Sequence, residues 1–258
     1  MDLVGVAVVG VGTRGDGSGA AVTTVITLDG RSGSRPLSYC TPQACYRIVV
    51  STPRAEPDLW HEYLAGAARS YGAYGVEGVL ELGHIRDGSS TSLFFVAFSP
   101  DGEVVGGMRA QGPYTSADQA HALAEWDRDP GRPRVRALIE QRLPDGVVES
   151  KSAWVARGFV GRRELVGCFS RGPLHASTIL GARWALGTSA VHTLPMWTST
   201  GAVVATGLDA VGYPDDRYRT HLLWWDRWAL PTTVPDGVRR ALDAETAQLL
   251  SPVVPAGA

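Results

Sequence analysis

The segment "SLFFVAFSPDGEVVGGMRAQGP" (residues 92–113) decides the fold that the sequence predicts. Two apolar runs of strand-forming residues flank Pro100-Asp101-Gly102. Proline presets the backbone of a turn, aspartate bonds to nearby backbone groups, and glycine adopts the left-handed conformation without strain. The segment therefore predicts a β-hairpin, and the other elements can be placed around it.

Helices and strands are predicted on both sides of this hairpin. Upstream, "YRIVVS" (46–51) is typical of a strand, and residues 56–75 have the apolar spacing of an amphipathic helix. Downstream, the patterns predict helices at 116–126 and 136–146, a strand at 147–156, a helix at 173–186, a strand at 190–197, a helix at 198–212 and a strand within 213–230. This order is typical of an α/β or α+β domain in which helices flank a mixed sheet.

Composition changes along the chain divide it into three parts. Residues 1–45 are rich in Gly, Ser and Thr and are expected to form an appendage that ends in a loop at 31–45. Residues 46–230 contain the predicted domain. Residues 231–258 are expected to form a C-terminal helix (235–250) and a tail.

The appendage contains a motif with the G-x-G-x-x-G spacing of dinucleotide-binding folds, at Gly10, Gly12 and Gly15. That motif works only where the glycines open a helix between two parallel strands. Here a β-branched run begins at Val22, which leaves no room for the helix. We therefore interpret the segment as two antiparallel strands joined by a glycine-rich loop, or as a mobile arm. A nicotinamide oxidoreductase is the competing hypothesis.

Composition excludes several classes of function. The 258-residue chain has a formal net charge of -2, so no overall field attracts nucleic acid, and no apolar run is long enough to span a membrane. The three cysteines and six histidines form no zinc motif, so no metal is expected. We expect a cytoplasmic protein. The tryptophan-rich stretch "HLLWWDRWAL" (221–230) fits either a core or a homodimer interface.

Several segments resemble acyltransferases of the GNAT superfamily. "FFVAFSPDGEVVGGMRAQ" (94–111) resembles the second and third strands, and "GVVESKSAWVA" (146–156) resembles the fourth. Residues 179–197 and 208–227 resemble the helices and strands that follow. Within the superfamily, the chain is most similar to autoinducer synthases and N-acyl amino acid synthases, which carry a glycine-arginine after the hairpin and an E-x-S-R-like strand. The resemblance covers residues 46–230.

This resemblance implies a central twisted sheet whose fourth and fifth strands splay apart. The acyl thioester of coenzyme A or of an acyl carrier protein would lie in the gap as a co-substrate, without a permanently bound cofactor. The acyl group would pass to a small-molecule amine. Backbone amides near Trp154 and Val155 would polarise the thioester carbonyl.

The resemblance also implies roles for particular side chains. Glu149, on the fourth strand, would be the general base, and Arg109 would bind a carboxylate or phosphate of the substrate. Tyr213 and Tyr218 are candidates for the acid that protonates the leaving thiolate. The donor's phosphates would meet the loop and helix start after the fourth strand, at Arg157, Arg162, Arg163, Arg171 and Gly172. Each charged residue also fits an ordinary solvated or ion-paired position.

Three departures from the family pattern leave a second hypothesis open. "VARGFVGRRE" (155–164) has the residue types of the pyrophosphate loop in a different spacing. The E-x-S-R pattern becomes Glu149-Ser150-Lys151-Ser152, without its arginine, and Leu208 stands at the place of the usual catalytic tyrosine. The alternative is a catalytically degenerate GNAT-like protein that binds a ligand or a regulatory partner.

Overall fold

The computed structural model of the protein describes residues 7–10, 23–26, 36–41 and 46–251. Its strands are β1 (Ala7–Gly10), β2 (Thr23–Ile26), β3 (Leu37–Cys40), β4 (Arg47–Ser51), β5 (Leu93–Phe98), β6 (Val104–Gln111), β7 (Val147–Val155), β8 (Trp184–Ala190), β9 (Val203–Val204) and β10 (Thr220–Asp226). Its α-helices are α1 (Pro57–Gly72), α2 (Leu82–Ile85), α3 (Ala122–Glu125), α4 (Arg132–Glu140), α5 (Arg162–Phe169), α6 (Gly172–Ile179), α7 (Leu194–Thr198) and α8 (Asp236–Leu250). Short 3-10 helices are η1 (Glu77–Leu80), η2 (Ala117–Gln119), η3 (Leu143–Asp145) and η4 (Val191–Thr193).

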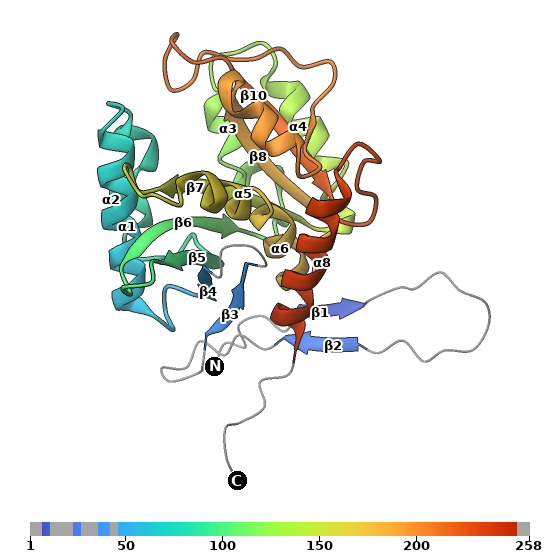
Figure 1. The fold of residues 1–258 in the computed structure, drawn as a ribbon. Coiled ribbons are helices and arrows are strands. Elements are labelled where there is room, and N and C mark those ends of the chain that lie inside the picture. Colours follow the sequence, from blue (N-terminus) through green and yellow to red (C-terminus); the bar gives the residue numbers. More distant parts are fainter. Residues whose placement is uncertain (1–6, 11–22, 27–35, 42–45, 252–258) are drawn as a thin grey trace, which may run out of the picture.

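Eight of these strands form one mixed sheet with helices on both faces (Figure 1). The strand order is β3-β4-β5-β6-β7-β8-β10-β9, and neighbouring strands are antiparallel except for β7 and β8. This confirms the predicted α+β class and the GNAT-like mixed sheet flanked by helices. No helix in the described ranges has both the length and the apolar character needed to cross a bilayer.

The predicted hairpin is β5 and β6. Their register pairs Phe95 with Met108 and Phe94 with Arg109. At the turn, Gly102 has a φ of +87°, a backbone conformation that glycine adopts without the strain of a side chain. The local signal was sufficient here because the turn and both strands lie within one short segment.

The parallel pair β7–β8 separates soon after it begins. Pairing covers only Val147–Glu149 of β7 and Trp184–Leu186 of β8. β7 then continues along β6 to Val155, whereas β8 continues along β10 to Ala190. The splay that the resemblance implied between the fourth and fifth strands is therefore present.

Four predicted elements differ from the structure. The helix expected at 173–186 ends at Ile179, and the strand begins at Trp184 rather than at residue 190. Residues 190–197 form η4 and α7, and the helix expected at 198–212 is replaced by β9 and loops. Likewise, the helix expected at 116–126 is broken into η2 and α3. Pairing with β10 determines β8, and no local pattern contains that information.

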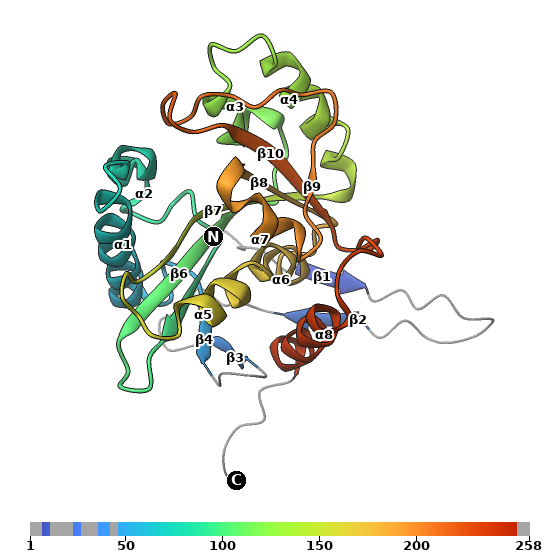
Figure 2. The ribbon, with the colours of Figure 1, turned by 45° about the horizontal axis from the view of Figure 1, so that its top comes forward.

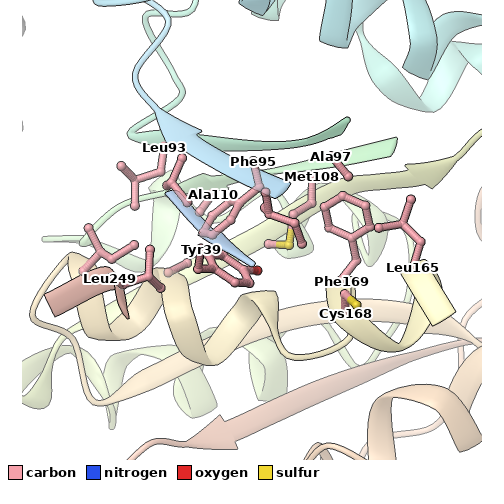
Figure 3. Close-up of a cluster of buried hydrophobic side chains, with 14 of the residues drawn as sticks. Tyr39, Leu93, Phe95, Ala97, Met108, Ala110, Leu165, Cys168, Phe169 and Leu249 are labelled. Carbon is pink, nitrogen blue, oxygen red and sulfur yellow. The ribbon is translucent and has the colours of Figure 1, made fainter. Parts of the chain in front are cut away.

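One face of the sheet packs against α5, α6 and α8 (Figure 3). Phe95 and Met108 point from the strands toward Leu165 and Phe169 of α5, and Leu249 of α8 belongs to the same cluster. All five side chains are buried. Figure 2 shows α5 and α6 lying across β6 and β7. This layer fixes the position of the loop and helix that follow β7.

The opposite face is covered by α1 and, farther along the sheet, by α3 and α4. Phe94 packs against Trp60 and Tyr63 of α1. Leu186 and Trp224, on β8 and β10, belong to the cluster that includes α3 and α4. Successive residues of a strand alternate between faces, so β6 and β7 contribute side chains to both layers.

Two elements outside residues 46–230, β3 and α8, pack with the main sheet. β3 lies within residues 31–45, which were predicted to be loop, yet it is the first strand of the main sheet. Helix α8 packs beside β3, and Gln248 makes hydrogen bonds with the backbone of Cys40. The sheet therefore begins before residue 46, and the C-terminal helix packs beside its first strand.

The first glycine of the motif, Gly10, lies in a separate two-stranded sheet. β1 and β2 pair in antiparallel register, with Gly10 opposite Thr23. The dinucleotide-binding interpretation requires a parallel pair joined by a helix, so the antiparallel interpretation is confirmed. Gly12, Gly15 and the rest of the connection lie outside the described residues.

Candidate active site

A cleft of about 430 Å³ opens where β7 and β8 separate. Val166 and Phe169 of α5 line it from one face of the sheet, whereas Tyr71 of α1 and Glu125 of α3 line it from the other. The cleft therefore passes through the gap in the sheet.

A β-bulge shapes the β7 wall of this cleft. Ser152 and Ala153 together oppose the single residue Met108 of β6, and Ser152 has a φ of +52°. The hydroxyl of Tyr63 donates to the Ser152 carbonyl at 2.9 Å, and that of Tyr71 donates to the Ala153 carbonyl at 3.3 Å. Burial raises the pKa of Tyr71 to about 12, so its hydroxyl remains a donor. Such distortions often occur at functional sites.

Glu125 is the most unusual carboxylate in the cleft. Its Oε1 accepts hydrogen bonds from Lys151 Nζ at 2.8 Å and from Thr188 Oγ1 at 2.9 Å. His121 Nδ1 lies 3.1 Å from the same oxygen and 2.6 Å from Lys151 Nζ. The other oxygen, Oε2, is buried and has no hydrogen-bond partner within the described part of the chain. A buried carboxylate oxygen without a donor is costly, which indicates a ligand site.

The surroundings of Glu125 keep it ionised. Burial raises its pKa, but the charge of Lys151 and the hydrogen bond to His121 outweigh burial and hold the pKa below the usual glutamate range. Glu125, His121 and Glu149 could together supply metal ligands, because their donor atoms lie within 4.8 Å of one another. However, Lys151 Nζ lies 2.6, 2.8 and 3.9 Å from donor atoms of His121, Glu125 and Glu149, so an ammonium already takes a cation's place among these donors.

The structure corrects the environment expected for Glu149. This carboxylate is fully buried and is not part of the cleft wall. Its Oε2 accepts from the Tyr114 hydroxyl at 2.7 Å and from the His121 backbone N–H at 2.8 Å, and its Oε1 accepts from the Ala122 N–H at 3.0 Å. Both oxygens are occupied, so Glu149 anchors the start of α3 to β7 instead of facing an incoming amine.

Arg109 lines a second cavity, of about 430 Å³, on the α2 and α3 side of the sheet. Its side chain is buried, with 3% of the residue's surface exposed. Nη1 donates to Thr91 Oγ1 at 3.3 Å, whereas Nε has no partner among the described residues. Arg109 is also the cross-strand neighbour of Lys151. A buried guanidinium with free donors favours binding of a planar anion.

The residues predicted to bind the donor fall into two groups. Trp154, Val155 and Arg162 line the cleft, and Arg162 donates to the Val155 carbonyl. Arg157 and Arg163 are exposed, on the loop after β7 and on the first turn of α5. The structure therefore brings these five residues to the end of β7, where a helix begins.

Arg171 and Gly172 do not belong to this group, which corrects their prediction as donor-binding residues. The Arg171 guanidinium is buried and forms a two-point ion pair with Glu245 of α8, including an Nε–Oε2 bond of 2.8 Å. His175 Nε2 lies 2.9 Å from the same Oε2. A Cβ on Gly172 would stand 2.1 Å from Met108 Sδ, so this glycine is needed for packing.

Both candidate tyrosine acids line the cleft. The ring of Tyr213 lies 6.4 Å from the ring of His121, and that of Tyr218 lies 6.2 Å from that of His192. Burial, followed by the nearby Glu125 carboxylate, raises the pKa of Tyr213 well above its ordinary value. Tyr213 therefore stays protonated and able to donate.

Sequence reasoning did not identify Glu125 and His121. One signal was available, because His121 and Glu125 are four residues apart and share a face of the predicted helix. Their partners Lys151 and Thr188 are distant in sequence, so only the folded chain brings the four side chains together.

Comparison with solved structures finds acyltransferases. The acyl-homoserine lactone synthase BjaI, solved with SAM and isopentyl-CoA, is 12% identical with a TM-score of 0.48, and the match covers 78% of this chain and 96% of that chain. FeeM, an N-acyl amino acid synthase from uncultured soil microbes, is 12% identical with a TM-score of 0.45, covering 76% and 98%. A putative phosphinothricin N-acetyltransferase is 14% identical with a TM-score of 0.44, covering 69% and 98%.

Sequence comparison finds closer relatives, although no protein-family model matches the chain. The uncharacterized protein Rv1356c of Mycobacterium tuberculosis (strain H37Rv) is 45% identical over 197 residues, which cover 76% of this chain and 75% of the relative. The uncharacterized protein Mb1391c of Mycobacterium bovis gives the same values. The chain therefore belongs to the same protein family as these two mycobacterial proteins.

Proposed function

We propose that the protein is an N-acyltransferase, which moves an acyl group from a thioester to an amine in the cleft between β7 and β8. The observation that carries this proposal is the buried Oε2 of Glu125, an ionised carboxylate that lines the cleft, because this oxygen has no hydrogen-bond partner among the residues that the structure describes. An incoming ammonium supplies both the charge and the donors that this oxygen lacks. The same carboxylate can then accept the proton that the amine must lose.

The α5 face of the cleft suits the acyl donor. Val166, Phe169 and Met196 give this part of the lining an apolar character. The splay of β7 from β8 leaves the backbone near Trp154 and Val155 beside the gap, where its amides would polarise the thioester carbonyl. The donor is an acyl thioester of coenzyme A or of an acyl carrier protein.

Charged side chains at the end of β7 support the same orientation of the donor. Arg157 and Arg163 are exposed, and Arg162 lies in the first turn of α5, where the helix dipole also favours anions. Phosphate groups of the donor would bind there. The thioester would then extend from these residues into the gap.

The second cavity supports an acceptor that carries a carboxylate. The Arg109 guanidinium lies beside Lys151 on the acceptor face, with free donors for a planar anion. An amino acid would pair its carboxylate with Arg109 and its ammonium with Glu125. This makes N-acyl amino acid synthesis the specific reaction that we propose.

In the reaction, the amine nitrogen attacks the thioester carbonyl carbon, and the carbon–sulfur bond breaks. Glu125 binds the ammonium and takes a proton from it before attack. Tyr213 or Tyr218, which both line the cleft, donates a proton to the leaving thiolate and regains one from the nitrogen, which loses its second proton on becoming an amide. Glu149 holds α3, and thereby Glu125, against β7.

Thiol release tests the proposal. Purified protein would be incubated with acetyl-, octanoyl- or palmitoyl-coenzyme A, or with acyl carrier protein thioesters, and with each amino acid or its decarboxylated amine. Thiol release that requires an amino acid, and is weaker with the matched amine, is the expected result. Thioester binding by calorimetry without turnover on any acceptor would instead support a non-catalytic binding protein.

A further inference from the structure

A row of polar side chains leads from the cleft to the surface. Glu125 Oε1 lies 2.8 Å from Lys151 Nζ, which lies 2.6 Å from His121 Nδ1. On the other edge of the ring, His121 Nε2 lies 3.5 Å from Glu81 Oε2. The side chains of Glu125 and Lys151 are 1% and 10% exposed, whereas that of Glu81 is 49% exposed. The row therefore joins a buried carboxylate to one in water.

We propose that Glu125, Lys151, His121 and Glu81 form the path by which a proton leaves the cleft during acyl transfer. This inference rests on the proposed function. It adds roles for three residues, because Lys151, His121 and Glu81 would act through Glu125 and would not touch the substrate's reacting atoms. Glu81, between η1 and α2, would be the exit of the path.

The chemistry of amide formation requires such an exit. A primary ammonium carries three protons; the amide nitrogen keeps one, and the leaving thiolate takes one to become a thiol. One proton remains for each turnover. It is released on Glu125, whose Oε2 is shielded from water, so turnover would stop unless this carboxylate could pass the proton on.

Transfer has one direction in the tautomer in which His121 Nδ1 accepts a hydrogen bond from Lys151. When Lys151 donates to Nδ1 of a neutral His121, the ring proton must be on Nε2, facing Glu81. Lys151 can then pass a proton to Nδ1 while Nε2 releases its own proton to Glu81 and water. Protonated Glu125 recharges Lys151, which restores both groups. Exchange of the ring proton with water returns His121 to the starting tautomer.

Charged side chains surround His121. Carboxylates face it from three sides: Glu81 before α2, Glu125 on α3 and Glu149 on β7. The opposing cation in contact is Lys151, and the Tyr213 ring packs against the imidazole. Other charged groups around the adjoining cavity are His84, Arg109, Asp118, Asp127 and Arg132.

Kinetics of His121→Asn test the path. We expect kcat to fall roughly 10²-fold near neutral pH with both KM values little changed. The defect should shrink as pH rises, and added imidazole should restore part of the rate. His61→Asn, on the exposed surface of α1, is the matched control and should keep the wild-type rate. An unaltered kcat in folded His121→Asn, or a defect that neither pH nor imidazole changes, would overturn the path.

Nitrogen NMR of His121 in the substrate-free protein gives a second readout that does not depend on activity. The path predicts an Nε2-protonated ring that loses this preference in Lys151→Met. An Nδ1-protonated ring in the wild type would overturn it. If the wild type releases no thiol with any acceptor, the proposed function fails, and this spectrum still decides whether Lys151 donates to His121.

Discussion

Two buried carboxylates, Glu125 and Glu245, have the same kinds of neighbours and differ in one respect. Each lies beside a histidine and a basic side chain, and each has a pKa below the usual glutamate range because these neighbours outweigh burial. Both oxygens of Glu245 are hydrogen-bonded, whereas Oε2 of Glu125 has no partner in the part of the chain that the structure describes. We call the Glu245 cluster closed, because both of its carboxylate oxygens are occupied, and the Glu125 cluster open, because one oxygen can accept a ligand.

The basic residue explains the difference. Arg171 presents a planar fork that bonds to both oxygens of Glu245 and so ties α8 to α6. Lys151, the single lysine in the chain, is a point charge that reaches only Oε1 of Glu125. Because the basic residue here is a lysine and not an arginine, one oxygen of the buried carboxylate stays available to a ligand.

The largest expected effect comes from removing the open carboxylate. Glu125→Gln should reduce kcat/KM for the acceptor by roughly 10²- to 10⁴-fold, because the ammonium loses its counter-charge and the proton its acceptor. Steady-state thiol release would measure this. Glu103→Gln, at the exposed hairpin tip, is the control. Equal rates for the two variants would refute the role of Glu125.

Substitution of Glu245, in the closed cluster, should reduce the free energy of unfolding instead of the rate of thiol release. Glu245→Gln breaks a buried pair with Arg171, which costs about 3–5 kcal/mol of unfolding free energy at neutral pH. Because the folded pKa is lowered, this contribution exists above the ordinary glutamate pKa of about 4.3 and is lost as pH falls further. Denaturant unfolding should therefore show wild type and variant converging in acid. A constant difference down to pH 2 would contradict this assignment.

Arg109 provides an intermediate case, because it is a buried cation that forms no ion pair with a carboxylate of the described residues. Arg109→Met should raise the acceptor KM roughly 10- to 100-fold, from the 1.5–3 kcal/mol that a charged hydrogen bond contributes. It should leave the melting temperature unchanged or raise it, because an uncompensated buried charge is removed. Steady-state kinetics and thermal unfolding of one preparation would test the expected rise in KM and the expected absence of a loss in melting temperature. A large loss of stability with an unchanged KM would show that Arg109 is structural.

The smallest effect should come from making the open cluster resemble the closed one. In Lys151→Arg, a guanidinium fork can reach both oxygens of Glu125 and compete with the ammonium of the acceptor. We expect the acceptor KM to rise roughly tenfold, the scale of one 1.4 kcal/mol interaction, without loss of stability. An acceptor KM equal to the wild-type value would mean that the fork leaves Oε2 free.

The comparison also explains what the sequence could predict. The hairpin around Gly102 and the strand 147–156 were identified because turn residues and apolar alternation are local. Arg171 and Glu149 were identified as charged residues near the expected site, but their partners Glu245 and Tyr114 lie 74 and 35 residues away. Whether the hydrogen-bonding atoms of a charged side chain already have partners depends on such distant contacts. The sequence therefore could not separate the closed clusters from the open one.

Strand β8 shows that the fold, too, depends on contacts between residues distant in sequence. "WALGTSA" (184–190) has apolar residues that also suit a helix, and the preceding segment begins as one. Pairing with β10 decides its conformation, and its separation from β7 creates the cleft. The feature that matters most for function was therefore outside the reach of local patterns.

The central claim is that Oε2 of Glu125 binds the ammonium of the acceptor. The most direct measurement is a crystal structure with the amino acid that supports the fastest thiol release. The account predicts the amino nitrogen within hydrogen-bond distance of Glu125 Oε2, with the carboxylate on Arg109. An acceptor that lies elsewhere in the cleft and leaves this oxygen without a donor would contradict it.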